Sequence, residues 1–273
     1  MSGKLYVVGT PIGNLGDLSP RALETLENAD FIAAEDTRVT LKLLNHFGIK
    51  KEMISYFEHN KGFKGEVIID RILKGEICAL VSDAGMPAIS DPGEDLVREC
   101  RQADIEIESV PGPTAVATAL SISGFPTKRF CFEGFLAVDK NARREHLEEI
   151  KAEKRTMVFY EAPHKLKATL KDMLETLGNR EIAIVKELTK IYEDVFITTF
   201  EHALKYYDEN PPKGEFVVII KGANEEKQTY TIEDAVKIAK GLMAKGESAS
   251  FSAKESAKIT GIKKGDIYKE ILN

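Results

Sequence analysis

Residues 77–93 read ICALVSDAGMPAISDPG, an apolar run followed by two aspartates that stand beside small or rigid residues. The run at 77–81 is continuously apolar, which is typical of a parallel strand covered on both faces. The residues around Asp83 and Asp91 have the composition of turns. The stretch therefore predicts a buried strand whose carboxyl end opens into a built loop, and ligands bind at such ends in open parallel sheets.

Strand-like and helix-like segments alternate on both sides of this stretch. Ser19 and Pro20 are expected to start a helix as N-cap and first residue, and Gly48 is expected to end the next one. The alternation predicts an α/β fold with a mostly parallel sheet in the first 110 residues. The expected strands are 4–9, 31–36, 53–58, 77–83 and 105–110, and the expected helices are 19–29, 37–48, 63–75 and 93–103.

The rhythm changes at residues 110–126, where two prolines flank a glycine ahead of a helix of small residues. Further on, 181–189 and 192–200 read as strands close enough in sequence to form a hairpin, so the second half is expected to have a mixed sheet. We predict an α/β domain at 1–112 and a second one at 113–224.

The polar segment 223–229 looks like a linker, and three short helices are expected in a third domain at 230–273. Ala257, Gly261 and Ile267 have the spacing of a helix-turn-helix, in which glycine permits the sharp turn. A plain three-helix cap and a nucleic-acid reader fit this spacing about equally well.

Composition narrows the class of protein. The 273 residues are 43% hydrophobic and 30% charged, with a formal net charge of −6, which is typical of a folded protein without strong nonspecific affinity for nucleic acid. Residues 229–273 nevertheless carry eight lysines against six acidic residues. Membrane spans and a secretory signal are not evident. Cys78, Cys100 and Cys131 are widely spaced, so we expect reduced thiols, no metal site and a cytoplasmic location.

Three loops at strand ends could carry chemistry. In residues 9–20, Gly9, Gly13 and Gly16 allow close backbone approach, but the spacing matches neither a Rossmann fingerprint nor a P-loop. In the opening stretch, Asp83 is expected to contact a ligand, whereas Asp91 is expected only to organise a turn and cap the following helix. The third loop, SVPGPTA at 109–115, has prolines that fix its backbone.

Taken in order, these loops resemble the ribosomal RNA small-subunit methyltransferase I family, within the tetrapyrrole-methylase-like class of S-adenosylmethionine-dependent enzymes. The matching stretches are GTPIGNLGDLSPRAL, AAEDTR, VSDAGMPAISDPG, SVPGPTA, FYEAPHKL, KELTKIYED and GEFVVII, within residues 5–222. One departure follows GFL, where the family usually has a proline and further basic residues and this chain has Ala137 and Val138.

The resemblance implies two α/β domains of the tetrapyrrole methylase type, a small C-terminal helical segment, and a homodimer. It implies methyl transfer from S-adenosylmethionine to the ribose 2′-oxygen of a decoding-site cytidine in 16S rRNA of the small ribosomal subunit. The cofactor-binding residues that it implies are Pro11, Ile12, Asp83, Gly85, Met86, Ile89, Thr114 and Ala115, with Tyr160, Gly214 and Glu215 from the second half.

Transfer to a ribose hydroxyl is helped by a base that takes the hydroxyl proton. We expect Glu35, Asp36 and Arg38 to line the acceptor site, although Glu35 and Asp36 could instead cap the next helix or pair with Arg38. Glu161 with His164 and Lys186 with Glu187 are other candidates, and the base is left open. The residues expected to contact RNA are Arg38, Lys128, Arg129, Lys140, Arg143 and Arg144.

Two other functions remain compatible with the sequence. A tetrapyrrole-precursor methyltransferase of the same fold would act on a different class of substrate and would not need the AAEDTR stretch or the terminal helices. A DNA-binding regulator whose α/β part senses a ligand would use the helix-turn-helix spacing, but the charge of +2 on that segment is modest for such a role.

Overall fold

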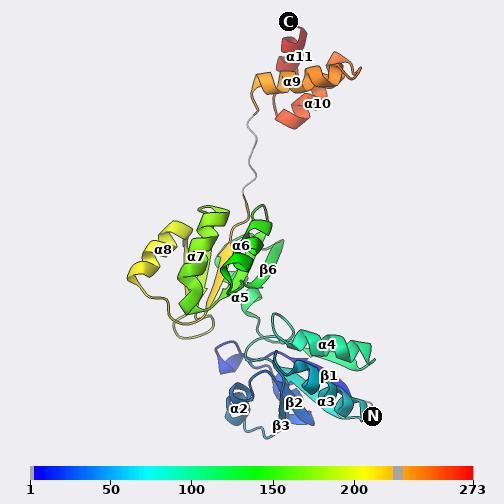
Figure 1. The fold of residues 1–273 in the computed structure, drawn as a ribbon, viewed down its shortest axis with the longest axis vertical. Helices are drawn as coiled ribbons and strands as arrows, with labels where there is room; N and C mark the ends of the chain where they lie inside the picture. The colour runs from blue at the N-terminus through cyan, green and yellow to red at the C-terminus, as the bar shows by residue number, and fades with distance from the viewer. Residues whose placement is uncertain (1–2, 224–229, 273) are drawn as a thin grey trace. The chain divides into compact units, whose positions relative to one another are not determined.

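The computed structural model describes residues 3–223 and 230–272 (Figure 1). Residues 1–223 form one compact unit, which holds two five-stranded sheets, and residues 224–273 form a second. The predicted linker at 223–229 lies outside the described residues except for Ala223. Within the part of the chain that the structure describes, no helix is long and apolar enough to cross a membrane.

The first sheet has the strand order β3-β2-β4-β1-β5, and each pair of neighbours is parallel, as predicted. All five carboxyl ends therefore meet at one edge. The strands are β1 (Lys4–Val8), β2 (Phe31–Ala34), β3 (Glu52–Ser55), β4 (Ile77–Val81) and β5 (Glu106–Val110).

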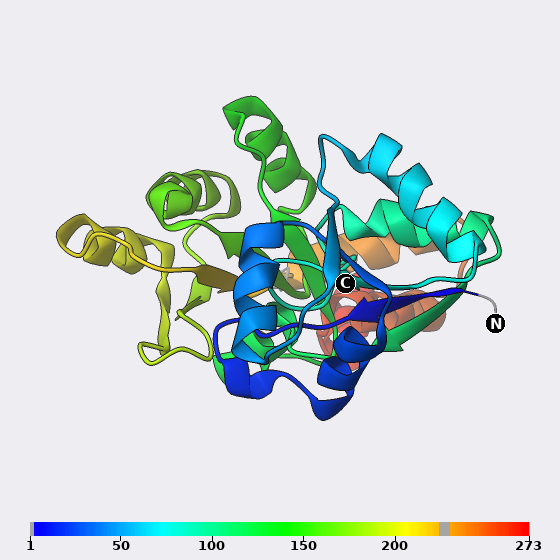
Figure 2. The ribbon, with the colours of Figure 1, turned by 90° about the horizontal axis from the view of Figure 1, so that it is seen from below.

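Helices cover both faces of this sheet (Figure 2). Side chains alternate along a strand, so Leu80 packs with α3 and α4 while Val81 packs with α1 and α2. Burial on both faces explains why residues 77–81, which precede the loop at the carboxyl end of β4, are all apolar. The helices of this part of the chain are the 3₁₀-helix η1 (Leu15–Asp17) and the α-helices α1 (Pro20–Asn28), α2 (Thr37–His46), α3 (Lys61–Leu73) and α4 (Gly93–Gln102).

The predicted helix ends are confirmed. Ser19 Oγ accepts a hydrogen bond from Ala22 N at 3.1 Å, and Pro20 is the first residue of α1. Gly48 follows α2 with a φ of 72°, a conformation that glycine adopts without strain. These local rules place the helix ends, and the start of each helix marks where the preceding strand-end loop finishes.

The second sheet is mixed, with the order β6-β7-β10-β8-β9. β6 pairs with β7 in parallel, and the other neighbours are antiparallel, including the predicted hairpin of β8 and β9. Helices α6, α7 and α8 pack on one face and α5 on the other. The elements are α5 (Ala115–Ser123), β6 (Phe130–Phe135), α6 (Lys140–Glu149), β7 (Thr156–Glu161), α7 (Pro163–Leu177), β8 (Glu181–Lys186), β9 (Asp194–Thr199), α8 (Phe200–Glu209) and β10 (Phe216–Ile220).

The second unit contains the three predicted helices, α9 (Ile232–Met243), α10 (Ala249–Thr260) and α11 (Lys264–Leu272). They share a small core that includes Ala239, Ala253 and Ile267. Gly261 ends α10 with a φ of 72°, which is the turn that the sequence indicates. The domain boundary between residues 112 and 113 stays a prediction, because both sheets belong to the same compact unit.

Candidate functional site

The three loops singled out in the sequence converge at the carboxyl ends of β1, β4 and β5. Gly9 N donates to Val110 O at 2.9 Å, which ties the first loop to the third. Thr10 and Gly85 exchange two backbone hydrogen bonds, of 2.9 and 3.1 Å, which tie the first loop to the second. Backbone groups thus hold these loops together, and the arrangement is fixed by the order of the strands.

A contact between glycines brings the first and third loops still closer. A Cβ built on Gly112 would lie 2.8 Å from the Gly9 backbone, and one built on Gly9 would lie 2.6 Å from Gly112 Cα and 2.7 Å from Met86 Sδ. Real Cβ atoms do not come this near to other atoms, so neither position accepts a side chain unless the backbone moves. The expectation that Gly9 allows close backbone approach is confirmed.

The second loop holds its own shape through Asp91. Asp91 Oδ1 accepts hydrogen bonds from Ala88 N at 3.0 Å and Gly93 N at 2.8 Å, so the predicted turn-forming role is confirmed. Ala88 and Ser90 have φ values of 65° and 67°, which are strained for residues with a side chain. Such strain persists where the surroundings enforce it, and it clusters at functional sites.

An apolar wall lies beside these loops. Ile12, Ala115 and Tyr160, all expected to bind the cofactor, belong to one hydrophobic cluster of the second sheet. The Tyr160 hydroxyl accepts a hydrogen bond from Val116 N at 3.0 Å, and burial raises the pKa of Tyr160. This residue thereby fixes the first turn of α5 against β7.

The other expected cofactor residues are distributed around the same loops. Pro11 is half-buried, and Thr114 is the N-cap residue of α5. Gly85 has a φ of 86°, and its backbone faces Ile12 and Pro113. Ile89 is 51% exposed at the outer part of the second loop. The structure therefore brings the first-half candidates together at one edge of the first sheet.

Acidic side chains occupy the ends of β2 and β4. Asp36 N donates to Asp83 Oδ1 at 3.0 Å, and Asp83 N donates to Glu35 Oε2 at 3.4 Å. Burial, followed by the charge of Asp83, raises the pKa of Glu35, and partial burial raises the pKa of Asp83. These two carboxyl groups are thus better proton acceptors than ordinary surface carboxylates.

Asp36 and Arg38 are engaged with each other. Arg38 Nη2 lies 2.6 Å from Asp36 Oδ2, and Arg38 N donates to Asp36 Oδ1 at 2.8 Å. The hydrogen bonds from the Arg38 side chain lower the pKa of Asp36 to about 2. Asp36 therefore acts as the N-cap of α2 and is a weak base, so Glu35 is the stronger candidate for taking a proton.

The loop between β8 and β9 packs on the first loop, a contact that the sequence reasoning missed. A Cβ on Gly13 would lie 2.7 Å from Lys190 Cγ and 2.8 Å from Thr189 Oγ1. Thr189 has a φ of 65°, and its buried hydroxyl has no hydrogen-bond partner among the described residues. Buried polar side-chain atoms normally have a hydrogen-bond partner, so this hydroxyl is an unusual feature of the contact between the two loops.

Gly214 and Glu215 connect to this loop through Glu187 and Lys190. Lys190 Nζ lies 3.0 Å from Glu187 Oε1 and 2.8 Å from Glu215 Oε2. Glu215 N donates to Glu187 Oε1 at 3.0 Å, and Gly214 has a φ of 90°. The two predicted cofactor residues thus support the loop that covers Gly13. The alternating charges of KELTKIYED are the feature of the sequence that could have indicated such ion pairs.

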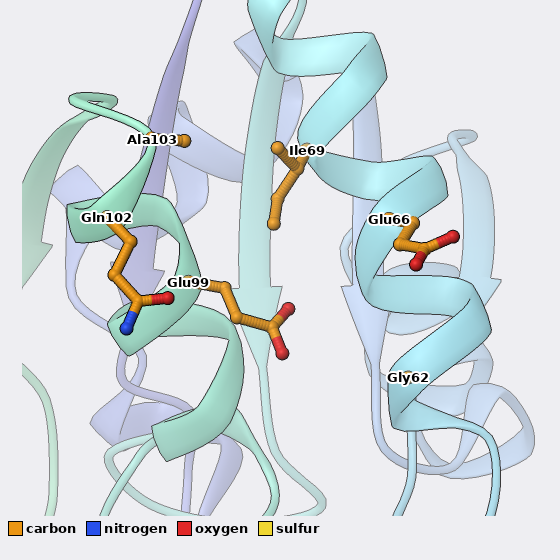
Figure 3. Close-up of a pocket in the computed structure, with 6 residues that line it drawn as sticks. All are labelled: Gly62, Glu66, Ile69, Glu99, Gln102 and Ala103. Atoms are coloured by element: carbon orange, nitrogen blue, oxygen red, sulfur yellow. The ribbon is translucent and has the colours of Figure 1, made fainter.

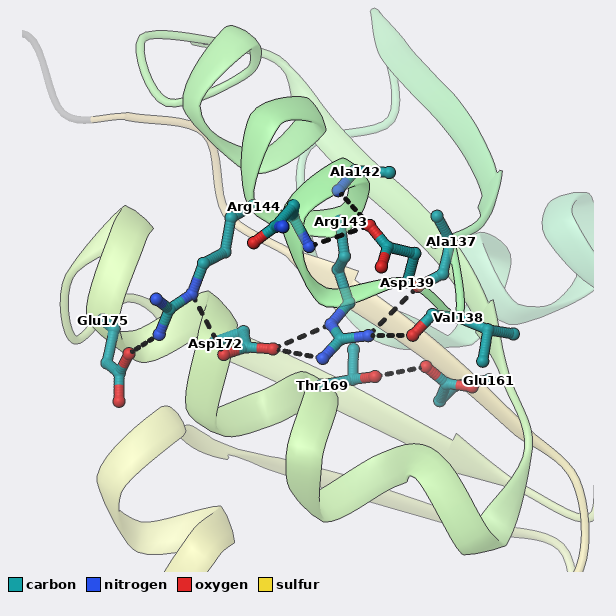
Figure 4. A network of polar contacts seen from close by, with 11 residues as sticks. Ala137, Val138, Asp139, Ala142, Arg143, Arg144, Glu161, Thr169, Asp172 and Glu175 are labelled. Carbon is teal, nitrogen blue, oxygen red and sulfur yellow. Dashed lines mark hydrogen bonds and ion pairs between the residues drawn. The ribbon is translucent and has the colours of Figure 1, made fainter.

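The residues expected to contact RNA fall into separate places. Lys128 and Arg129 are exposed ahead of β6, whereas Lys140 and Arg144 are exposed after it. Arg143 has a side chain only 12% exposed and is paired with Asp172 at 2.6 Å (Figure 4). Protein groups occupy its guanidinium, so we replace the expected RNA contact at Arg143 by a structural role.

A surface depression of about 400 Å³ lies between α3 and α4 (Figure 3). Glu66 and Glu99 are among the residues that line it, with the carboxylate of Glu99 directed toward α3, and none of the predicted site residues lines it. The three cysteines also lie outside the site. Cys78, Cys100 and Cys131 are buried and form no disulfide, as expected.

Sequence comparisons identify similar proteins over nearly the whole chain. The family model of tetrapyrrole (corrin/porphyrin) methylases matches residues 4–204. The ribosomal RNA small subunit methyltransferase I of Synechocystis sp. is 45% identical over 268 residues, which cover 97% of this chain and 96% of that protein. The protein of the same name from Thermotoga maritima is 47% identical over 220 residues, covering 81% of this chain and 99% of that protein.

Among solved structures, the uroporphyrin-III-C-methyltransferase from Thermus thermophilus is similar, with a TM-score of 0.57. The sequence identity is 21%, and the match covers 80% of this chain and 94% of that one. At this identity the match establishes the fold alone. It confirms the predicted pairing of a parallel first sheet with a mixed second sheet.

Proposed function

This chain belongs to the ribosomal RNA small subunit methyltransferase I family, within the tetrapyrrole methylases, and from that premise we propose that it methylates a ribose 2′-oxygen in 16S rRNA. The observation that carries the proposal is identity of 45% over 97% of the chain. The acceptor that we propose is a cytidine of the decoding site. The convergence of the three strand-end loops supplies the place for the reaction.

Enzymes of this family use S-adenosylmethionine, which supplies a methyl group on a positively charged sulfur. The residues present fit this molecule in charge and polarity. Asp83 and Glu35 place carboxyl groups at the strand ends, and Ile12 with Tyr160 offers apolar surface for the adenine ring.

The protein's own contribution to the reaction is positioning and proton transfer. The strained second loop and the glycine contact at Gly9 and Gly112 hold the site in one shape, and a fixed geometry supplies much of the acceleration in a transfer of this kind. We assign Glu35 as the base, whose carboxylate would take the proton of the acceptor hydroxyl. Its raised pKa supports this assignment over Asp36.

The two alternatives are not retained. Relatives that match this chain at nearly full length are ribosomal RNA enzymes, whereas the tetrapyrrole enzyme shares the fold at 21% identity. A DNA-binding regulator would depend on the second unit, whose charge of +2 over residues 229–273 is modest for such a role.

Partners and location follow from the proposed substrate. Small-subunit rRNA is the macromolecular partner, and we place the protein in the cytoplasm, where ribosomes are assembled. A homodimer is the assembly that the family resemblance implies. Size-exclusion chromatography with light scattering tests it directly, with about twice the chain mass of 30.3 kDa expected.

One assay tests the proposed function. The protein is incubated with methyl-labelled S-adenosylmethionine and with undermethylated small subunits, free 16S rRNA, or a porphyrin precursor. We expect label in the rRNA, and mass spectrometry of nuclease digests should locate it on a cytidine ribose. Label in the porphyrin alone, or on a base instead of a ribose, would refute the proposal.

A further inference from the structure

The connection between β6 and α6, residues 136–139, is a short loop with an unusual exposure. Leu136 is 5% exposed and anchors its start, whereas Val138 is 74% exposed. Asp139 caps α6 by accepting hydrogen bonds from Asn141 N at 3.0 Å and Ala142 N at 2.9 Å. The loop therefore displays an apolar side chain while both of its ends are fixed.

Arg143 fixes the middle of this loop. Its Nη1 donates to Ala137 O at 3.1 Å and to Val138 O at 3.0 Å (Figure 4). On the other side, Nε donates to Asp172 Oδ2 at 2.8 Å, and Nη2 lies 2.6 Å from the same oxygen. One guanidinium thus joins the loop, α6 and α7.

The neighbouring arginine is held much less tightly. The side chains of Arg143 and Asp172 are 12% and 7% exposed, and separating a buried ion pair is strongly unfavourable. Arg144 is 45% exposed; its Nη2 lies 2.6 Å from the exposed Glu175 Oε2, and its Nε lies 3.6 Å from Asp172 Oδ1. Exposed ion pairs contribute little to stability, so Arg144 can exchange Glu175 for a phosphate.

The loop begins where the candidate site ends. Gly134, near the end of β6, has a φ of 64°, and Ser90 Oγ lies 3.0 Å from where its Cβ would be. Ser90 belongs to the second strand-end loop. The ring of Phe135 lies 5.5 Å from that of Tyr160, which belongs to the apolar wall. Residues 136–139 therefore continue directly from the candidate site.

The basic residues at the two ends of β6 differ in their distance from the loop of residues 136–139. Six residues of strand separate Lys128 and Arg129 from the loop, a distance of roughly 17–20 Å at the usual rise per residue. The end of β6 that meets Ser90 leads into this loop, Lys140 is the first residue of α6 after it, and Arg144 lies one turn further along α6. Charge complementary to RNA phosphates at the candidate site is thus supplied by Lys140 and Arg144.

We propose that residues 135–140 form an RNA-contacting loop, that the Arg143–Asp172 pair is the device that positions it, and that Lys140 and Arg144 bind phosphates of the substrate RNA. This inference depends on the proposed function. The exposed Val138 contacts a sugar or an unstacked base, since RNA is read mainly through such groups. Phosphate contacts set the register of a protein on its nucleic acid, so a displaced loop weakens binding more than chemistry.

The positioning pair is tested with Asp172→Asn and with Arg143→Lys, which keeps the charge but loses the fork of donors. We expect KM for undermethylated small subunits to rise about 5- to 20-fold, with kcat and the Kd for S-adenosylmethionine within twofold of the original. The matched control is Asp208→Asn, which breaks an exposed ion pair with Lys167 at 2.6 Å and should leave KM unchanged.

A purely structural role for the pair predicts a different result. It would lower the melting temperature and the active fraction, which titration with S-adenosylmethionine measures, and it would leave KM per active site unchanged. That result overturns the positioning proposal. If Asp172→Asn does not fold, Arg143→Lys decides the matter by the same criterion.

The phosphate contacts are tested through salt dependence. Each phosphate contact contributes about one to the slope of log affinity against log salt concentration, so Lys140→Ala with Arg144→Ala should reduce the slope by about two. Lys128→Ala with Arg129→Ala should leave it unchanged. The reverse pattern, or no change in either double variant, contradicts the proposal. If the unmodified protein transfers no methyl group to small-subunit rRNA, the proposed function itself fails.

Discussion

Two sets of loops border the candidate site, and they are held in place by different means. The three loops of the first sheet are joined by backbone hydrogen bonds and by the contact of Gly9 with Gly112. The loop between β6 and α6 is instead held by side chains, chiefly the ion pair of Arg143 with Asp172. Both arrangements are rigid, but they respond differently to substitution.

The two ways of holding the loops suit two different tasks. Backbone contacts leave no room for adjustment, which suits a site that must hold one small cofactor in a single geometry. A side-chain clamp can be retuned by single substitutions while the sheet stays unchanged, which suits a surface that must follow the shape of a large RNA. Ala137 and Val138, where the resemblance leads us to expect a proline and further basic residues, lie in this second region.

The largest expected effect comes from breaking the backbone contact with Gly112→Ala. The added Cβ would lie 2.8 Å from the Gly9 backbone, so one loop must move. We expect a loss of roughly 1–3 kcal/mol in the free energy of unfolding and at least tenfold weaker binding of S-adenosylmethionine. Thermal unfolding and calorimetry measure the two effects.

Gly62→Ala is the control for that change, since nothing lies within 4 Å of the Cβ that it adds. Its stability should stay within about 0.5 kcal/mol of the original. Equal cofactor affinity in the two variants would show that the glycine contact does not shape the site.

The next largest effects should distinguish the roles of Asp83 and Asp91, the two aspartates of the second loop. Asp83→Ala should weaken S-adenosylmethionine binding about 10- to 100-fold, because it removes a charged partner, and should lower the melting temperature less than Asp91→Ala, because it loses only the hydrogen bond from Asp36 N. Asp91→Ala loses hydrogen bonds to Ala88 N and Gly93 N, so it should lower stability by about 0.5–2 kcal/mol. Unchanged calorimetric affinity in Asp83→Ala would show that Asp83 is not a cofactor ligand.

The smallest effect concerns the neighbouring carboxyl groups at the end of β2. The pKa of Asp36 is lowered to about 2, so any stability it contributes is present above its ordinary value of 3.8 and is lost as the pH falls toward 2. The pKa of Glu35 is raised, so its effect has the opposite sign: stability decreases as the pH rises through that pKa.

Carbon-detected NMR titration resolves the two groups. In Arg38→Ala the pKa of Asp36 should move up toward 3.8, because the arginine hydrogen bonds are its main cause. In Asp83→Asn the pKa of Glu35 should fall only part of the way, because burial is the larger cause. A Glu35 pKa at or below 4.5 in the unmodified protein would remove the support for its role as base.

The sequence was informative wherever structure depends on local rules. Continuous apolar runs predicted buried parallel strands, Ser19 with Pro20 predicted a helix start, and Asp91 was correctly interpreted as a turn residue. The first-half cofactor candidates were also brought together, because parallel strands of one sheet end at the same edge. Glycine turns and strand ends depend on backbone conformation, and short segments of sequence largely determine that conformation.

Contacts between distant side chains could not be predicted in this way. Arg143 and Asp172 are 29 positions apart, and the sequence does not show which of the many charged residues would meet. The packing of Lys190 on Gly13 joins the two halves of the chain and was missed for the same reason. Arg143 was therefore assigned to the RNA surface, when its guanidinium is occupied inside the protein.

The position of β1 has a consequence for synthesis on the ribosome. Residues 4–8 are made before both of their partners in the sheet, residues 77–81 and 106–110. At about 5–20 residues per second, roughly 4–14 s pass before the first partner strand is made. During that interval the segment is an apolar strand without either of its partners, and unpaired strand edges make incompletely folded chains prone to aggregate.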